Sequence, residues 1–276
     1  MTRVGLLHPG EMGAAVGVAL RAGGADVLWA SEGRSDATRA RAGADALTDV
    51  GTLAQLVERS ETIVSVCPPH AALDLARAVT ACGFKGTYVD VNAVAPATAR
   101  EIAGAAGRVT DGGIIGGPPR VSGTTRLYLS GPGADEAAAL FAGSPLEAIV
   151  IEGDVGAASA LKMCFAAWTK GTSALLVAVR AVAAAEHVDG ALLEEWAISQ
   201  PNLAGRSEGA ARGTAAKAWR FVGEMHEIAD TFAAAGLPEG FHRAAADIYE
   251  RMAGFRDAEA APALEDVVAA VTRPRR

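Results

Sequence analysis

The first half of the chain alternates between short apolar runs rich in β-branched residues and longer stretches with apolar residues at helical spacing. Short runs of this kind predict buried strands, and spacings of three and four residues predict amphipathic helices. The predicted strands are Arg3–Leu7, Asp26–Trp29, Thr62–Val66, Thr87–Val91, Gly107–Asp111, Thr125–Ser130 and Glu147–Ile151. The predicted helices are Ala14–Ala22, Ser35–Ala42, Thr52–Arg59, Ala71–Ala81, Pro96–Ala106 and Asp135–Phe141.

This alternation predicts a Rossmann-type α/β fold, with a doubly wound, mostly parallel sheet and helices on both of its faces. After Gly153 the pattern changes, because nearly all of Ala157–His187 consists of helix formers and no later segment has the pattern of a strand. We therefore predict a dinucleotide-binding domain at residues 1–153 and an all-α domain at residues 154–276.

Composition and charge narrow the range of partners. The formal net charge of −7 argues against a nucleic-acid partner, which requires a basic surface. Charged residues or glycines interrupt every apolar stretch, so no membrane span is predicted. The three cysteines and five histidines lack the spacing of metal ligands, and we expect no metal site. Free thiols are typical of a reducing compartment, so we expect a cytoplasmic protein.

The first predicted strand is followed by a glycine-containing turn, His8-Pro9-Gly10-Glu11-Met12-Gly13, and then by a helix. Such a turn offers backbone N–H groups and the positive end of the helix dipole to a pyrophosphate. Gly10 and Gly13 occupy the second and third glycine positions of the dinucleotide pattern, whereas His8 stands at the first. We expect a dinucleotide cofactor here, and the alternative is a turn with a structural role only.

The residues after the second predicted strand bear on the choice of cofactor. Glu32 lies about where an acidic residue binds the ribose hydroxyls of NAD. Ser31, Arg34 and Ser35 together could instead surround the 2′-phosphate of NADP. We expect NADP as the cofactor, with NAD as the alternative. If these residues bind no cofactor, they form a solvated polar loop.

One lysine stands inside an otherwise apolar predicted helix, in Gly156-Ala157-Ala158-Ser159-Ala160-Leu161-Lys162. At helical spacing Lys162, Ala166, Thr169 and Ser173 share one face. An amine in apolar surroundings can exchange a proton with a reacting carbonyl oxygen. The alternative is a lysine whose side chain reaches from the edge of the helix to water.

Other candidate contacts follow strands of the first half. Gly116 and Gly117 offer unobstructed backbone N–H groups to a carboxylate or another anion. Asn92 could hydrogen-bond either the substrate or the nicotinamide ribose. Cys67-Pro68-Pro69 follows a strand at the point where the chain should pass the adenosine half of the cofactor. Nothing near Cys67 in the sequence would activate it as a nucleophile.

Four segments occur in the order of a known pattern. Residues 10–13 are similar to G-x-M-G, residues 90–96 to D-x-S-T-x-x-P, residues 111–117 to D-A-P-V-S-G-G and residues 156–162 to G-x-G-x-x-x-K. Together they resemble the superfamily of β-hydroxyacid dehydrogenases and 6-phosphogluconate dehydrogenase, which includes imine reductases. The chain looks most like its bacterial branch with a C-terminal domain of unassigned function.

The resemblance implies an NAD(P)-dependent oxidoreductase that acts on a small carbonyl or hydroxy compound, with Lys162 as general acid/base. It places Glu11 and Met12 beside the cofactor, and Ile115, Ala166 and Thr169 beside the substrate. Ile115 stands where serine is usual and Ala166 where asparagine is usual, so the substrate is expected to differ from the usual hydroxyacids.

Two alternatives to a hydroxyacid dehydrogenase remain. Imine reduction would suit the less polar pocket that Ile115 and Ala166 imply. A non-catalytic NAD(P)-binding sensor would have no need of Lys162. By analogy with the family we also expect a homodimer formed through the helical domain.

Overall fold

The computed structural model describes residues 1–256, 258 and 260–273, and it divides into two compact units, Met1–Met163 and Cys164–Arg276. The division falls inside the long helix α7 (Ala157–Ala185), later than the boundary predicted after residue 153. The reason is local, because the first turns of α7 are hydrogen-bonded to strands of the first unit.

The first unit is built on one sheet, to which the described residues contribute eight strands. The strands are β1 (Arg3–Leu7), β2 (Asp26–Trp29), β3 (Thr48–Asp49), β4 (Thr62–Ser65), β5 (Thr87–Asp90), β6 (Val109–Ile115), β7 (Thr125–Ser130) and β8 (Leu146–Val150). Their order in the sheet is β3-β2-β1-β4-β5-β6-β7-β8. Only the β6–β7 pair is antiparallel among them, so the mostly parallel sheet predicted from the sequence is confirmed.

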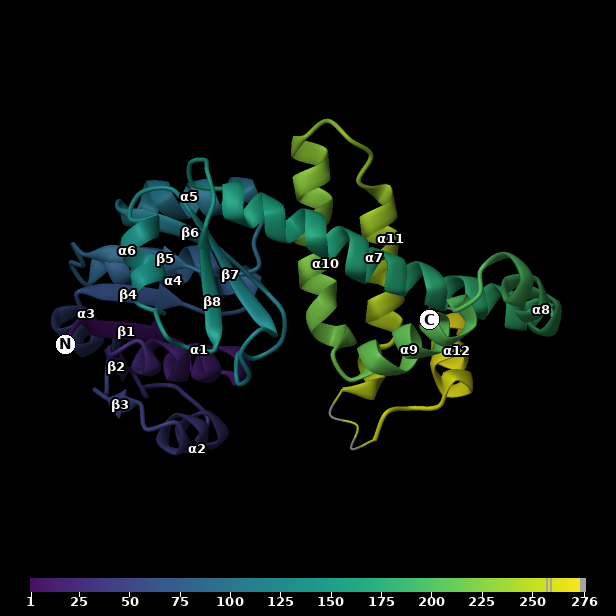
Figure 1. Ribbon diagram of the computed structural model, residues 1–276, viewed down its shortest axis with the longest axis horizontal. Helices are drawn as coiled ribbons and strands as arrows, with labels where there is room; N and C mark the ends of the chain where they lie inside the picture. Colours follow the sequence, from purple (N-terminus) through teal and green to yellow (C-terminus); the bar gives the residue numbers. More distant parts are fainter. Residues whose placement is uncertain (257, 259, 274–276) are drawn as a thin grey trace. The chain divides into compact units, whose positions relative to one another are not determined.

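Helices cover both faces of this sheet (Figure 1). They are α1 (Glu11–Ala22), α2 (Asp36–Ala44), α3 (Leu53–Arg59), α4 (Ala72–Ala81), α5 (Pro96–Ala106) and α6 (Ala134–Ala139). Apolar side chains of α1, α2 and α6 form one buried cluster with the sheet, and those of α3, α4 and α5 form a second. Burial of apolar surface on both faces explains why the strands are continuous apolar runs rather than alternating ones.

The order of the strands places a topological switch point between β1 and β4. The chain leaves β1 toward β2 on one side and later returns to β4 on the other side. In open α/β sheets, ligands bind outside the carboxyl ends of the strands at such a point. The segments that follow β1 and β4, which begin at His8 and Val66, are joined there by a hydrogen bond from the His8 N–H to the Val66 carbonyl at 3.2 Å.

Two details of the sheet differ from the sequence-based expectation. Strand β3 was not predicted, because two residues carry no periodic signal. Strand β6 was predicted as Gly107–Asp111 but runs on to Ile115. Gly112 and Gly113 favour a turn reading from sequence, yet both are paired with β7. The segment predicted as a substrate loop is therefore mainly strand, and the turn begins only at Gly116.

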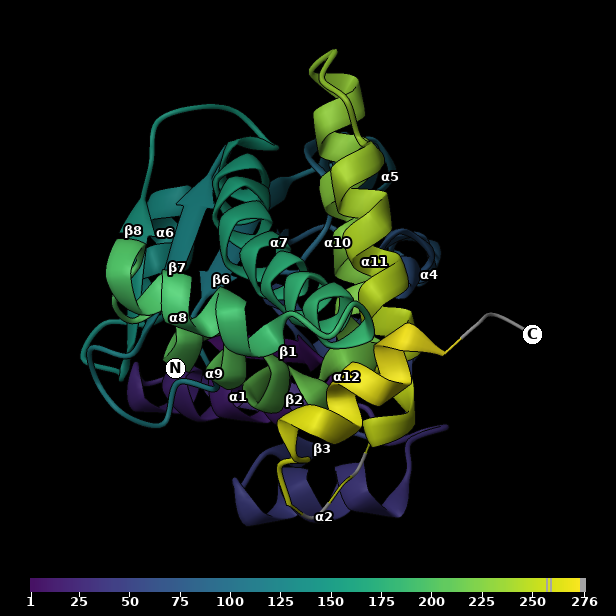
Figure 2. The ribbon, with the colours of Figure 1, turned by 90° about the vertical axis from the view of Figure 1, so that its right-hand side faces the viewer.

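The second unit is helical throughout its described residues. It contains the rest of α7 followed by α8 (Asp189–Ser199), α9 (Leu203–Ala215), α10 (Ala218–Ala234), α11 (Gly240–Arg251) and α12 (Leu264–Thr272). Helices α10 and α11 lie side by side in both views (Figures 1 and 2). The prediction of an all-α second region is confirmed for the residues that the structure describes.

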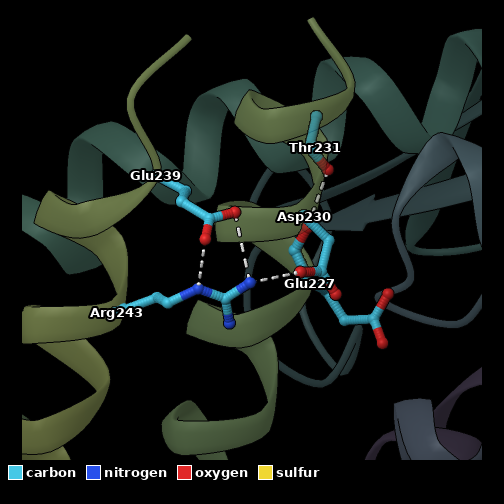
Figure 3. A network of polar contacts seen from close by, with 5 residues as sticks. All are labelled: Glu227, Asp230, Thr231, Glu239 and Arg243. Atoms are coloured by element: carbon cyan, nitrogen blue, oxygen red, sulfur yellow. Dashed lines mark hydrogen bonds and ion pairs between the residues drawn. The ribbon is translucent and has the colours of Figure 1, made fainter. Parts of the chain in front are cut away.

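Buried and exposed polar contacts in this helical unit differ in how much they contribute to the packing of its helices. Arg180 of α7 is buried and donates to Asp189 at 2.7 and 3.1 Å and to Ser207 at 3.0 Å. Arg243 of α11 instead joins Asp230 of α10 and Glu239 on the surface (Figure 3). Exposed ion pairs contribute about 0–1 kcal/mol, so the buried Arg180 contacts do more to define how α7, α8 and α9 pack.

Candidate functional site

The turn after β1 is shaped for a close backbone approach. A Cβ atom at Gly13 would lie 2.0 Å from the His8 carbonyl oxygen, so only glycine fits there. A Cβ at Gly10 would meet nothing within 4 Å, which leaves the approach to the start of α1 open. Gly10 is the N-cap of α1 and has no side chain to cap it. An uncapped helix start with open access is the backbone arrangement that binds phosphate.

His8 occupies the first glycine position of the turn and is largely buried. Its Nδ1 atom has no hydrogen-bond partner. Burial, together with the nearby Arg34 guanidinium, lowers the pKa of His8 from 6.5 to about 4. The imidazole is therefore neutral at pH 7 and adds no positive charge to the turn.

Two arginines lie close to the same turn. The Arg34 guanidinium is near enough to His8 to lower its pKa, and it also donates to the Glu32 carbonyl at 3.4 Å. Arg41 of α2 donates to the Pro9 carbonyl at 3.2 Å. Arg41 could not be predicted as a neighbour of this turn, because nothing in its spacing along the sequence shows that α2 brings it back there.

The two serines of the predicted phosphate loop have partners within the protein. Ser31 is buried and its hydroxyl donates to Asp49, whose pKa this bond lowers against the opposing effect of burial. Ser35 is the N-cap of α2, and its oxygen accepts the Thr38 N–H at 3.3 Å. The start of α2 is thus directed toward the same loop as Arg34. Glu32 is exposed beside them.

Asn92 was expected to contact the substrate or the ribose, but the structure places it in the interior. It is 3% exposed, and its amide oxygen accepts the Cys67 N–H at 2.6 Å. Its amide nitrogen donates to Ser65 and to Asp90. These bonds tie the ends of β4 and β5 together and hold the Cys67-Pro68-Pro69 segment at the switch point.

Cys67 has the chemistry of an inert thiol. Burial and the nearby Asp90 raise its pKa to about 12, against a hydrogen bond from Ser65. A thiol with so high a pKa carries almost no thiolate at neutral pH. The high pKa agrees with the expectation that Cys67 does not act as a nucleophile. Pro68 beside it is exposed, and Pro69 begins a 3₁₀ turn that leads into α4.

The predicted substrate residues at the end of β6 and just after it lie in different surroundings. Ile115 is only 5% exposed. Gly116 has a φ of +129° and packs against Thr124 and Thr125, so it is needed for the turn itself. A Cβ at Gly117 would meet nothing within 4 Å, and its N–H lies on the exposed part of the turn. Of the three, Gly117 alone has the open backbone that anion binding requires.

Arg120, further along the same turn, is already paired. Its guanidinium donates to both carboxylate oxygens of Asp45, at 2.8 and 2.7 Å. This bidentate bridge attaches the β6–β7 turn to the end of α2.

The residues predicted along α7 are divided between the two units. Lys162 lies in the first unit and is half-buried against β6. Ala166 and Thr169 belong to the second unit. Ala166 is 1% exposed, and the Thr169 hydroxyl donates to the Phe165 carbonyl at 3.1 Å. Thr169 also lines a groove of about 460 Å³ between α7 and α9, together with Trp168, Thr172, Ser173 and Arg206.

The described residues offer no group of three or more His, Cys, Asp or Glu side chains that could hold a metal ion. In the same part of the chain, no helix has both the length and the apolar character needed to span a lipid bilayer.

Comparison with known proteins adds to this geometry. Residues 183–252 match a family model described as a domain of unknown function, DUF1932. A curated 28.5 kDa protein of Methanothermus fervidus, itself uncharacterized, is 34% identical over 57% of this chain. The match covers 62% of that protein, so the chain spans less than two thirds of this relative's length.

Solved structures match over nearly the whole chain. One is MTH1747, a conserved protein of unknown function described as structurally similar to 3-hydroxyacid dehydrogenases; it is 25% identical, with 98% and 100% of the two chains covered and a TM-score of 0.69. A second is 3-hydroxyisobutyrate dehydrogenase of Mycobacterium tuberculosis, with 17% identity, 99% and 100% coverage and a TM-score of 0.70. The chain has the fold of the 3-hydroxyacid dehydrogenases. The resemblance inferred from the sequence is thereby confirmed.

A third structural match is a reductive aminase from Aspergillus terreus in complex with NADPH and ethyl levulinate. It is 15% identical, with 98% and 99% of the chains covered and a TM-score of 0.56. At this identity the likeness concerns the fold alone.

Proposed function

We propose that this protein is an NADP-dependent oxidoreductase that transfers hydride between nicotinamide and a small carbonyl or hydroxy compound. The observation that carries the proposal is the open, uncapped glycine turn at the switch point of the sheet. The match to the fold of 3-hydroxyacid dehydrogenases supports a dehydrogenase-like oxidoreductase.

The residues around the turn fit a phosphorylated dinucleotide. Glu11, Met12 and Gly13 would hold the pyrophosphate on backbone N–H groups at the start of α1, and Gly10, whose own N–H donates to the His8 carbonyl at 2.8 Å, would leave room for its approach. Arg34, with the start of α2 capped by Ser35 and with Ser31 behind it, would hold the 2′-phosphate of NADP. Cys67, Pro68 and Pro69 would line the site, with Asn92 holding their backbone.

The nicotinamide, when bound, supplies or accepts the hydride. During carbonyl reduction, the Lys162 ammonium would donate a proton to the oxygen as negative charge develops on it. During alcohol oxidation, the neutral amine would accept that proton. The open N–H of Gly117 would bind an anionic group of the substrate, and Ile115 beside it would limit the polarity of that substrate.

A second candidate function is imine reduction. Ile115 and Ala166 are both buried and apolar where the family motif has polar residues, and a reductive aminase shares the fold. Apolar residues at these two motif positions would favour a C=N substrate with less polar substituents. A cofactor-binding sensor without catalysis would leave Lys162 without a role.

We also propose that the protein is a cytoplasmic homodimer assembled through its helical region. Five large apolar side chains of α7 are exposed: Leu161, Phe165, Trp168, Leu175 and Val182. They follow one another at spacings of three, four or seven residues, which is the repeat by which helices pair. An exposed apolar stripe of this kind is typical of an interaction surface.

The decisive experiment is a fluorescence titration of the protein with NADPH and with NADH, followed by a screen of small carbonyl and imine substrates for NADPH consumption. We expect NADPH to bind about tenfold or more tightly than NADH, a difference of about 1.4 kcal/mol. Lys162→Ala should keep its NADPH affinity and lose about 10²- to 10⁴-fold in turnover. Failure to bind either nucleotide would exclude the proposed function, and wild-type turnover by Lys162→Ala would exclude the proposed role of Lys162.

A further inference from the structure

The start of α7 is held by a side chain of the sheet. The first N–H groups of a helix have no partner within the helix. Here the N–H groups of Gly156 and Ser159 both donate to Oδ2 of Asp111, each at 2.9 Å. The Ser159 hydroxyl donates to Oδ1 of the same carboxylate at 2.6 Å. Asp111 of β6 thus caps α7 from outside the helix.

The neighbouring strand completes this cap. The Ser130 hydroxyl oxygen of β7 accepts the Ala158 N–H at 3.0 Å. Its hydroxyl group is also within 3.3 Å of Asp111 and 3.1 Å of the Asp154 carbonyl. Asp111, Ser130 and Ser159 are all at most 1% exposed. A negative charge at the positive end of a helix dipole is favourable, and burial strengthens the interaction.

Further along the same face of β6, the sheet touches Lys162 directly. A Cβ atom at Gly113 would lie 2.9 Å from the Cβ of Lys162 and 2.8 Å from the Ala158 carbonyl oxygen. The helix therefore packs on the strand backbone at a distance that no side chain would permit. The family motif D-A-P-V-S-G-G has proline at this position, so the contact depends on a residue in which this chain departs from the motif.

We propose that β6 positions Lys162 through two residues of one strand face. Asp111 fixes the start of α7, and Gly113 sets the distance between the lysine and the sheet. Both are positioning residues, since neither is argued to touch substrate. The inference rests on the proposed function only in taking Lys162 as the proton donor, because the contacts themselves are independent of any reaction.

The adjacent glycine of β6 provides a matched control. A Cβ at Gly112 would lie 2.7 Å from Cγ1 of Val91 and 3.0 Å from the Asp90 carbonyl oxygen. Gly112 and Gly113 are both buried, and successive residues of a strand face opposite sides. A Cβ at either position would meet neighbouring atoms at similarly short distances, but at Gly112 these atoms belong to the sheet and its adjoining segment, and at Gly113 they belong to Ala158 and Lys162 of α7.

The test compares Gly112→Ala and Gly113→Ala in the full chain by the rate at which an amine-acetylating reagent modifies Lys162, followed by mass spectrometry. Lys85, an exposed lysine outside the site, serves as the internal reference. We expect faster acetylation of Lys162 in Gly113→Ala alone, because the helix start is pushed away from the sheet. Equal rates in the two variants would overturn the proposal.

Ser159→Ala is a milder variant in case Gly113→Ala does not fold. It removes one hydroxyl bond to Asp111 and leaves both N–H donors in place. It should also raise the acetylation rate of Lys162, and a rate equal to that of the wild type would contradict a cap that positions the lysine.

Enzymatic turnover is a second measurement. If Gly113 had a purely structural role, its replacement would not lower kcat while leaving KM and NADPH affinity unchanged. With NADPH and the substrate found by the screen, Gly113→Ala should lower kcat about tenfold or more while KM and NADPH affinity stay near wild type, since misplacement by 1 Å can cost about a hundredfold. If the wild type consumes no NADPH with any substrate, the proposed function fails, while the acetylation comparison still decides whether β6 positions Lys162.

Discussion

Gly13 and Gly113 differ in how well their structural roles could be predicted from the sequence. Gly13 stands at the third position of a known glycine pattern, and the structure gives the reason, because any Cβ there would collide with the His8 carbonyl. Gly113 lies in an Asp-Gly-Gly run that is typical of a turn. Its actual role depends on a helix that begins more than forty residues later, and the sequence contains no local signal of that contact.

Arg34 and Arg41 allow the cofactor assignment to be tested residue by residue. Arg34→Ala should weaken NADPH by about tenfold or more and leave NADH nearly unchanged, since a hydrogen bond to a charged group is worth about 1.5–3 kcal/mol. Arg41→Ala should weaken both nucleotides alike, because its guanidinium lies against the turn at Pro9. Fluorescence titrations of both variants with both nucleotides measure this; equal losses in Arg34→Ala would contradict the assignment to NADP.

At the scale of elements, four strands together create a feature that no single strand encodes. Ser65 of β4, Asp90 of β5, Asp111 of β6 and Ser130 of β7 pair in register across the sheet. All four are at most 1% exposed, so they form a buried polar row. The strands were predicted from their apolar character. The register between neighbouring strands cannot be derived from the sequence of either strand alone, so the buried polar row could not be predicted.

The two carboxylates of this polar row have different surroundings. Asp111 accepts hydrogen bonds from the start of α7, whereas Oδ2 of Asp90 has no partner. Burial and the neighbouring Asp111 raise the pKa of Asp90 from 3.8 to about 8, against the hydrogen bonds from Asn92. Asp90 therefore holds its proton to a higher pH than a free carboxyl group does.

A pH dependence of stability follows from this pKa. Between pH 3.8 and about 8 the folded state holds a proton on Asp90 that the unfolded chain releases, so this group makes the free energy of unfolding fall as pH rises. Asp90→Asn removes the titration. The melting temperature of Asp90→Asn relative to wild type should therefore increase from pH 5 to pH 8. A difference that stays constant with pH would show that Asp90 is ionised in the folded state.

For the whole molecule, the sequence predicted most of what the structure contains. The α/β region and the helical region were foreseen because long periodic segments carry strong signals. The position of the division between the two units was harder to predict from the sequence. Composition changes at Gly153, but the first turns of α7 are bound to β6 and β7 and so remain with the sheet. Tertiary hydrogen bonds, rather than composition, decide where the first unit ends.

The proposed homodimer gives a prediction at this scale. Replacing Trp168 and Leu175 together by glutamate puts two charges on the exposed apolar stripe of α7 and should convert a dimer into a monomer in size-exclusion chromatography with light scattering. Val121→Glu, at an exposed apolar position outside α7, is the control and should leave the dimer intact. A monomeric wild type would refute the proposed assembly.

The cap on α7 also has a consequence for the order in which this protein folds. Asp111 and Ser159 are separated by 48 residues, so the first turn of α7 gains its partners only after β6 and β7 have come together. During synthesis the sheet strands emerge first, and the carboxylate of Asp111 remains without its Gly156 and Ser159 donors until α7 follows. A fragment that stopped at Gly153 would lack the Gly156 and Ser159 donors of this carboxylate. One that continued to Met163 would contain every donor that the Asp111 carboxylate requires.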